Sequence, residues 1–274
     1  MEGLTMFDWG LFLSLLVVCV PGYFVGLQTN LRMIENLAEG QLSSDQELPA
    51  RPVLLLVSGI QLALFIAIPA AVGTALAPRV GLGAPFFEAL AAGEPLWPAV
   101  GPQLLPSILV AVAGALVFVA AYYGYFRPRF EAETLRAWED LRNGLGIWGR
   151  LLYGGIVEEV LTRWGLMTLF VWLGALIAGE PSPVVIWVAI VLSGVLFGLG
   201  HAPGYLAAGC EKSAIFFGAM ISLNLWASLI FGWLYWQYGL LSAMMAHMLF
   251  HLVWLPFDHY YYRRLVREPA SQGA

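Results

Sequence analysis

Two adjacent carboxylates and one guanidinium stand inside an otherwise apolar stretch, YGGIVEEVLTRWGLMTLF, at residues 153–170. They are Glu158, Glu159 and Arg163. A charged side chain at the centre of a bilayer costs about 2.5–3.5 kcal/mol even on the mildest insertion scale, so three such groups within six positions indicate a function. On a helix, Glu159 and Arg163 are four residues apart and can pair. Glu158 is turned by about 100° and faces another partner.

Three histidines provide the other ionisable groups at membrane depth. His201 closes the apolar run SGVLFGLGHAPGY, with Phe197 one turn before it. His247 and His251 lie four residues apart in AHMLFHLVW, so their rings share one helix face. Ionisable residues inside a membrane usually serve a function. The structural alternative is a buried Glu–Arg clamp together with histidines that hydrogen-bond across helices.

The elements that must position these groups are membrane-spanning helices. The chain has 274 residues, of which 60% are hydrophobic and 11% are charged, whereas a soluble domain carries about 25% charged residues. A helix needs about 20 residues to cross the hydrocarbon. Seven apolar segments are long enough, at approximately residues 10–28, 52–77, 103–125, 151–177, 183–202, 213–236 and 239–257. We therefore expect an all-α polytopic membrane protein of about seven transmembrane helices, forming a single membrane domain over residues 1–274.

The connections differ in character. Residues 29–51 form a polar connection, and residues 78–102 predict a short interfacial or re-entrant piece. Residues 126–147 have the pattern of an amphipathic helix at the membrane surface. The acidic N-terminus, MEGLTMFDWG, indicates that the first apolar run is a retained span and not a cleaved signal peptide. The two cysteines, Cys19 and Cys210, form neither a disulfide framework nor a metal cluster.

The basic residues predict the orientation, because cytoplasmic loops of membrane proteins carry an excess of Lys and Arg. With seven spans, Arg79 is the one basic residue in the connections on one side. Eleven lie on the other side: Arg32, Arg51, Arg127, Arg129, Arg136, Arg142, Arg150, Lys212, Arg263, Arg264 and Arg267. We expect an external N-terminus and a cytoplasmic C-terminus. Glu158 and His251 then lie roughly 12 Å and 9 Å from the cytoplasmic ends of their spans, at 1.5 Å per residue, and all the intramembrane groups can converge in that half.

Taken together, three motifs resemble the CAAX protease and bacteriocin-processing (CPBP, ABI) family of intramembrane glutamic proteases. They are Glu158-Glu159-x3-Arg163, Phe197-x3-His201 and His247-x3-His251. The resemblance covers about residues 148–258. One departure concerns His251, since the last family motif usually has Asn or Asp at that position. The family also often has eight spans.

The resemblance implies a role for each group. Glu158 would be the general base, and His201 would help to hold and deprotonate the attacking water. Glu159 would pair with Arg163 and fix the helix. His247, with His251, would donate hydrogen bonds to the tetrahedral oxyanion.

The substrate class follows from the same resemblance. It is a protein or peptide with a hydrophobic or lipidated tail, such as a prenylated CAAX tail, a secretion leader or a C-terminal sorting tail.

The expected location is the inner (cytoplasmic) membrane of a bacterium or archaeon. The expected partners are the substrate and membrane lipid, with no nucleic acid, and the oligomeric state is left unassigned.

Three alternatives stay open. We expect no cofactor. The first alternative is a zinc hydrolase, because the ligand types that suit zinc are present in Glu158 or Glu159, His201 and His247. The sequence has no HExxH pair. A proton-coupled transporter would also place ionisable groups at membrane depth, but the sequence has no inverted repeat. A non-enzymatic membrane scaffold would tolerate the replacement of Glu158.

Overall fold

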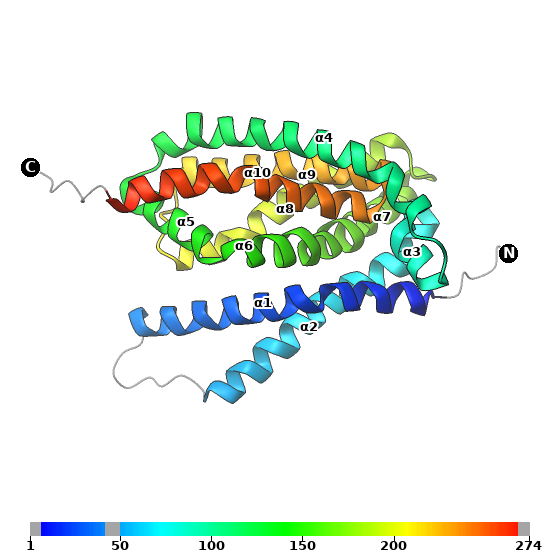
Figure 1. Cartoon of the computed structure of the whole chain (residues 1–274), viewed down its shortest axis with the longest axis horizontal. Helices are drawn as coiled ribbons and strands as arrows, with labels where there is room; N and C mark the ends of the chain where they lie inside the picture. Colours follow the sequence, from blue (N-terminus) through cyan, green and yellow to red (C-terminus); the bar gives the residue numbers. More distant parts are fainter. Residues whose placement is uncertain (1–6, 42–49, 268–274) are drawn as a thin grey trace, which may run out of the picture.

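The computed structural model describes residues 7–41 and 50–267, and within these ranges the chain is helical almost throughout and has no strands (Figure 1). Seven helices are long and apolar enough to cross a membrane, which confirms the fold class expected from the sequence. The α-helices are α1 (Trp9–Gln41), α2 (Arg51–Leu76), α3 (Pro85–Ala92), α4 (Trp97–Ala121), α5 (Ala132–Gly144), α6 (Gly146–Trp148), α7 (Thr168–Ala178), α8 (Pro183–Ala207), α9 (Ala214–Tyr238) and α10 (Leu240–Arg267).

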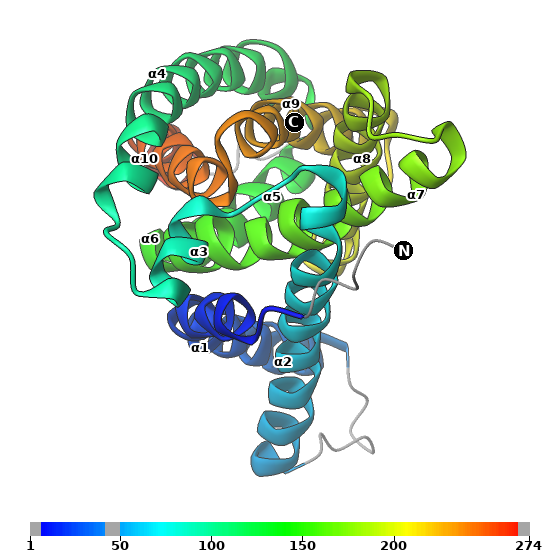
Figure 2. The same ribbon diagram turned by 90° about the vertical axis from the view of Figure 1, so that its right-hand side faces the viewer.

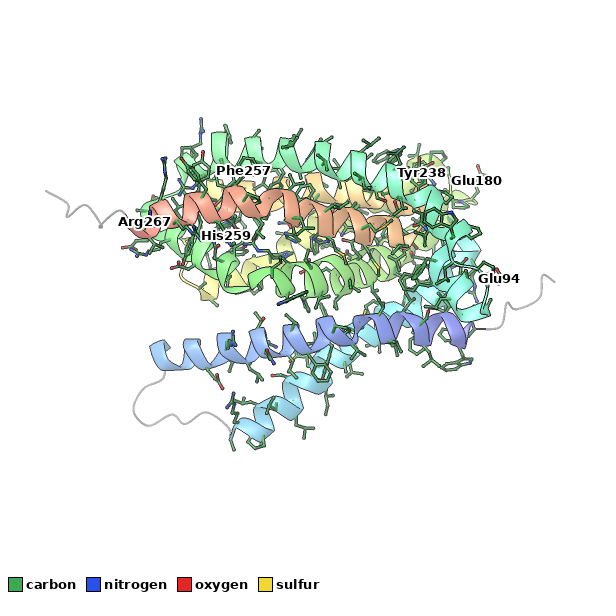
Figure 3. All side chains as sticks on the ribbon, viewed as in Figure 1. Glu94, Glu180, Tyr238, Phe257, His259 and Arg267 are labelled. Carbon is green, nitrogen blue, oxygen red and sulfur yellow. The ribbon has the colours of Figure 1, made fainter. Side chains whose placement is uncertain are left out.

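The spans form a bundle around a central span, Gly146–Ala178. α4, α9 and α10 lie on one side of this central span, and α1 and α2 lie on the other (Figures 1 and 2). The beginning of α2 points away from the remaining helices (Figure 2). The start of α1 and the end of α10 lie at opposite ends of the bundle, as an odd number of spans requires. Figure 3 shows Arg267 and His259 at one end, and Glu94, Glu180 and Tyr238 at the other.

Several helices are longer than their apolar runs. α1 continues to Gln41, so the first part of the expected 29–51 connection is helical, and residues 42–49 lie outside the described residues. α8 continues past His201 to Ala207, with Pro203 inside the helix, and α10 continues to Arg267. These three helices therefore extend beyond the apolar segments that end near residues 28, 202 and 257. Apolar length marks only the membrane-crossing part, because backbone hydrogen bonding continues a helix into polar surroundings.

The two irregular connections correspond to short helical pieces. Residues 78–102 contain a turn of 3₁₀-helix, η1 (Ala77–Val80), and α3, which has 8 residues and is too short to span a membrane. The 126–147 segment contains α5, so the predicted amphipathic helix exists. The prediction that this helix lies at the membrane surface is correct only in part, because two residues of its charged face, Glu139 and Arg142, are buried in the protein.

The central span departs from α-helical geometry. It begins with α6 and continues as two π-helical stretches, η4 (Gly149–Glu158) and η5 (Val160–Met167), before α7. The wider π-helix is rare and often occurs at functional sites. Two glycines in η4 allow α10 to approach closely. A Cβ at Gly154 would lie 3.2 Å from Nε2 of His251, and a Cβ at Gly155 would collide with the side chain of Met248.

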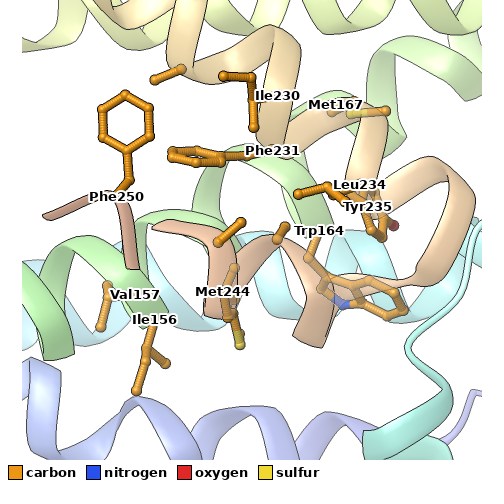
Figure 4. Close-up of a cluster of buried hydrophobic side chains, with 14 of the residues drawn as sticks. Ile156, Val157, Trp164, Met167, Ile230, Phe231, Leu234, Tyr235, Met244 and Phe250 are labelled. Carbon is orange, nitrogen blue, oxygen red and sulfur yellow. The ribbon is translucent and has the colours of Figure 1, made fainter. Parts of the chain in front are cut away.

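An apolar core surrounds the central span. Ile156, Val157 and Trp164 of the span belong to one buried apolar cluster with Met244 and Phe250 of α10, and Trp164 lies further along the span (Figure 4). Two polar contacts anchor that further part: the Trp164 indole donates to the carbonyl of Ala70 at 3.1 Å, and Thr168 and Tyr235 share a hydroxyl hydrogen bond of 2.8 Å. Two charged groups of the span, Glu159 and Arg163, are therefore held in a packed interior.

Candidate active site

Glu159 joins the central span to α10. Its side chain is fully buried, and its Oε1 accepts a hydrogen bond from Nη1 of Arg163 at 3.1 Å. The same oxygen lies 2.7 Å from Nδ1 of His247. The expected Glu159–Arg163 pair is therefore present, and Glu159 has a second partner that the sequence did not predict. Because a carboxylate only accepts, Nδ1 of His247 carries the proton.

Arg163 extends this connection to α9. Its Nη1 also donates to Thr162 Oγ1 at 2.7 Å, and its Nη2 donates to Ser228 Oγ at 2.9 Å. The guanidinium carbon lies 5.5 Å from the ring centroid of Phe197 and 5.3 Å from that of Phe231. These contacts are what a buried charge needs, since removing one member of a buried ion pair leaves the other charge uncompensated.

Glu158 and His201 form a second pair, which is partly exposed. Glu158 Oε1 lies 4.0 Å from His201 Nε2, and the two side chains are 20% and 31% exposed. This separation is too long for a direct hydrogen bond. It allows both groups to contact one water molecule at normal hydrogen-bonding distance. Glu158 and Glu159 thus face different partners, as their positions on the helix predicted.

The tautomer of His201 follows from its second contact. Nδ1 of His201 lies 2.7 Å from the carbonyl oxygen of Phe197, one turn earlier on α8. A carbonyl only accepts, so Nδ1 carries the proton, and in the neutral ring Nε2 is an acceptor. The acceptor nitrogen is the one that faces Glu158. The Phe197 ring meets the imidazole edge-on at 4.7 Å between centroids and limits its rotation.

His251 lies in a column of stacked rings along α10. The His247 ring packs between Phe231, at 4.6 Å between centroids, and His251, at 4.9 Å. Trp254 continues the column at 6.1 Å from His251. Nδ1 of His251 is buried and has no hydrogen-bond partner in the described part of the chain. The ring of His251 therefore packs against the face of the His247 ring that is opposite Phe231, and His251 does not contact Glu159 directly.

A further buried group of charges was missed by the sequence reasoning. We call it the guanidinium cluster, and it consists of Arg127, Glu139, Arg142, Arg150 and Asp258. Nε of Arg142 donates to Asp258 Oδ1 at 2.9 Å, and Nη2 of Arg150 donates to the other carboxylate oxygen, Oδ2, and to the carbonyl of Arg142 at 3.0 Å. Arg127 Nε donates to Glu139 Oε1 at 2.8 Å. The one sequence signal was that Asp258 follows His247 by eleven residues, which is three helical turns on the same face of α10.

Cys210 shows no sign of nucleophilic activation. It is buried in the connection between α8 and α9, and burial raises the pKa of its thiol to about 11. The side chain is therefore a neutral thiol near pH 7, and the thiolate is the nucleophilic form.

These features define an integral, multi-pass membrane protein whose ionisable groups meet inside the helix bundle. Residues 142–253 match the family described as "Type II CAAX prenyl endopeptidase Rce1-like". Residues 142–253 therefore carry an Rce1-like endopeptidase domain of the CPBP family, which confirms the resemblance found in the sequence. All six residues singled out there, Glu158, Glu159, Arg163, His201, His247 and His251, lie within the matched range. No curated protein and no solved structure matches the chain.

Proposed function

We propose that this protein is a glutamic intramembrane endopeptidase that hydrolyses a peptide bond in a membrane-associated or lipidated protein. The observation that carries the proposal is the pairing of Glu158 with His201. The carboxylate and the acceptor nitrogen of the imidazole lie 4.0 Å apart and their side chains are partly exposed, whereas Glu159 and Arg163 are buried and paired with each other. A base and a second acceptor around one water molecule are what activation of that water requires.

The hydrolysis divides into two steps. First, the water oxygen attacks the carbonyl carbon of the scissile bond while its proton passes to Glu158, with His201 orienting the water as acceptor. The carbonyl oxygen becomes an oxyanion. In the second step the tetrahedral intermediate collapses, the C–N bond breaks, and Glu158 returns the proton to the leaving amine. The products are a carboxylic acid, which keeps the second water proton until it ionises in water, and an amine, and the enzyme is regenerated.

His247 is placed to stabilise the oxyanion. Its Nδ1–H is held by Glu159, so an N–H at Nε2 requires the imidazolium form, which the carboxylate of Glu159 compensates. The stacking partners Phe231 and His251 hold the ring plane. An oriented N–H donor at an oxyanion accelerates acyl chemistry by roughly 10²–10³. In this proposal Glu159 positions His247 and does not touch the substrate.

We propose that the reaction needs no metal. Within residues 7–41 and 50–267, no three His, Cys, Asp or Glu side chains converge closely enough to ligate one ion. A catalytic zinc site normally has three protein ligands, and the nitrogen of His247 that would have to reach such a site belongs to a ring already anchored on Glu159. The contact of Nδ1 with Glu159 leaves Nε2 of His247 free to bind a metal, so chelation is the experiment that distinguishes the two mechanisms.

The membrane and the orientation are also proposals. We infer that the protein resides in the inner membrane of a bacterium or archaeon, with the N-terminus outside. The support is the asymmetry of basic residues, eleven against one. In this orientation Glu158 and His201 lie in the cytoplasmic half, where the tail of a cytoplasmic lipidated protein arrives.

A proteome-wide comparison tests the proposed function in cells. Cells that express either the wild type or the Glu158→Gln variant at equal levels are compared by mass spectrometry of the termini of their membrane proteins. We expect a defined set of new C-termini, with matching released peptides, only in the wild type. Identical sets of termini in both strains would contradict an endopeptidase.

A further inference from the structure

Two exposed arginines at the end of the bundle where α10 ends lie over exposed tyrosine rings. The guanidinium carbon of Arg129 lies 3.9 Å from the ring centroid of Tyr125, and that of Arg264 lies 4.5 Å from the ring centroid of Tyr260. The two tyrosines are 52% and 51% exposed, and both arginines are exposed as well. We call these four residues the aromatic–arginine surface.

Half-buried rings connect the two pairs. Tyr123, just after α4, stacks on Tyr261 of α10 at 4.3 Å between ring centroids, and the guanidinium carbon of Arg127 lies 5.0 Å from the Tyr261 centroid. Tyr125 follows Tyr123 by two residues, and Tyr260 meets Tyr261 edge-on at 5.2 Å. The two exposed pairs therefore border one contact between the end of α4 and the end of α10.

Both pairs lie where an apolar helix surface ends. The third span ends at Arg129 and the seventh at Arg267. On α10, Phe257, Tyr260 and Arg264 share one face, which therefore changes from apolar to aromatic to basic along the helix. Figure 3 labels Phe257 and Arg267 in these last turns. Because tyrosine is enriched at the level of the lipid headgroups, we expect the aromatic–arginine surface to lie at that level.

Both arginines keep hydrogen-bond donors for a ligand. A guanidinium that lies over a ring uses its face, whereas its N–H groups lie in its own plane. Nη1 of Arg129 donates to the carbonyl of Tyr125 at 2.6 Å, which helps to fix this side chain. Within residues 7–41 and 50–267, neither Arg129 nor Arg264 forms an ion pair with a carboxylate. Since a guanidinium binds two oxygens of one phosphate by parallel hydrogen bonds, a phosphate group suits both pairs.

We propose that the aromatic–arginine surface binds the headgroups of anionic phospholipids. Positive charge, in-plane donors and a position at headgroup level all favour this partner. The phosphate of a zwitterionic lipid is neutralised by the ammonium of the same headgroup, so lipids with a net negative charge should bind more tightly. Basic residues beside a membrane span are attracted to anionic lipids. In the proposed orientation the surface faces the cytoplasmic leaflet.

The test uses the full-length protein in non-ionic detergent and two lipids with a fluorophore on the acyl chain. Phosphatidylglycerol is the anionic probe, and phosphatidylcholine reports the affinity that does not depend on net charge. Anisotropy gives the dissociation constant of each lipid. The titrations contain about 0.5 M NaCl, where a Debye length of roughly 4 Å screens long-range attraction and direct contacts persist.

Two double variants remove the two components of the surface separately. Arg129→Gln/Arg264→Gln removes the cations, whereas Tyr125→Leu/Tyr260→Leu removes the rings and keeps the charges. All four side chains are exposed, so the fold should be retained, and thermal unfolding checks this.

The matched control is Arg51→Gln/Arg136→Gln. Both arginines are exposed and lie on the same side of the proposed topology. Neither lies over an aromatic ring in the described part of the chain. The control therefore removes the same amount of charge and leaves the aromatic–arginine surface intact.

We expect the wild type to bind phosphatidylglycerol roughly 10- to 30-fold more tightly than phosphatidylcholine, the effect of two arginines beside anionic headgroups. Arg129→Gln/Arg264→Gln should lose this preference. Tyr125→Leu/Tyr260→Leu should keep only part of it, because the rings no longer hold the guanidinium groups in place. The control should keep the preference of the wild type.

Three results would overturn the proposal. Equal affinity of the wild type for the two lipids would exclude selection of anionic headgroups. An equal loss in the control and in Arg129→Gln/Arg264→Gln would show that net charge alone attracts the lipid. Displacement of labelled phosphatidylglycerol by an equal concentration of inorganic phosphate would indicate a site for a soluble anion. None of these measurements involves hydrolysis, so this inference and the proposed function can fail independently.

Discussion

His247 Nδ1 lies 2.7 Å from Oε1 of Glu159, and that same oxygen accepts a hydrogen bond from Arg163. One carboxylate oxygen thus links the central span to α10 by a hydrogen bond and fixes the proton of His247 on Nδ1. The neighbouring carboxylate, Glu158, faces His201 on α8. In our proposal the two adjacent glutamates have separate tasks, one in positioning and one in chemistry.

Glu159→Gln should lower both stability and activity. It leaves Arg163 buried without its charge partner, and breaking such a pair typically costs about 3–5 kcal/mol. It also removes the charge that supports an imidazolium at His247, so kcat should fall as well. Thermal unfolding in detergent and peptide hydrolysis measure the two effects. Glu180→Gln, the same change at an exposed position, is the control and should alter neither.

His251 is the position at which the chain departs from the usual family motif. Its ring supports His247 in the stack and contacts η4 at Gly154. His251→Asn retains an N–H donor, so we expect substantial activity, whereas His251→Ala removes both the donor and the stacking partner and should lose most of it. A fully active His251→Ala enzyme would show that the residue only fills space and that His247 acts alone with backbone donors.

Gly154→Ala should disturb the position of the His251 ring from the side of η4. Its Cβ would lie 3.2 Å from His251 Nε2, closer than an ordinary contact, so the imidazole must shift. We expect a loss of kcat several-fold larger than any loss of thermal stability. The matched control is Gly218→Ala on α9, where a new Cβ meets nothing within 4 Å. Equal behaviour of the two variants would mean that the position of His251 does not matter for the reaction.

Chelation distinguishes the metal-free mechanism from zinc catalysis. After exhaustive treatment with EDTA, the purified enzyme should retain its activity and contain no stoichiometric zinc by elemental analysis. The physical reason is that Glu158 and His201 suffice to activate water in our proposal. Loss of activity on chelation, with recovery on addition of zinc, would favour the zinc alternative.

The orientation can be tested with reporter fusions. A reporter after Ala274 should be cytoplasmic, and a reporter inserted between α7 and α8 should be external, because the basic residues gather on one side of the seven spans. Both reporters on the same side would contradict the proposed topology.

The sequence predicted much of this arrangement and missed specific parts of it. Apolar length located all seven spans, and four-residue spacing predicted the Glu159–Arg163 pair. The π-helical geometry of η4 and η5 was not predicted, because hydrophobicity alone does not distinguish a π-helix from an α-helix. Asp258 lies directly after the apolar segment that ends at residue 257, but α10 continues and buries this side chain against Arg142 and Arg150. Long-range pairing of this kind cannot be deduced from spacing within one helix.

The central claim is that Glu158 is the general base, and hydrolysis by Glu158→Gln tests it most directly. Glutamine keeps the shape of the side chain and cannot accept the proton, while the buried Glu159–Arg163–His247 contacts are untouched. We expect hydrolysis of a farnesylated peptide to fall to background, with thermal unfolding and peptide binding like those of the wild type. His201→Ala should come close to this loss, and His247→Ala should retain more, with a decrease of roughly 10²–10³. A correctly folded Glu158→Gln protein that hydrolyses the peptide at the wild-type rate would contradict the mechanism.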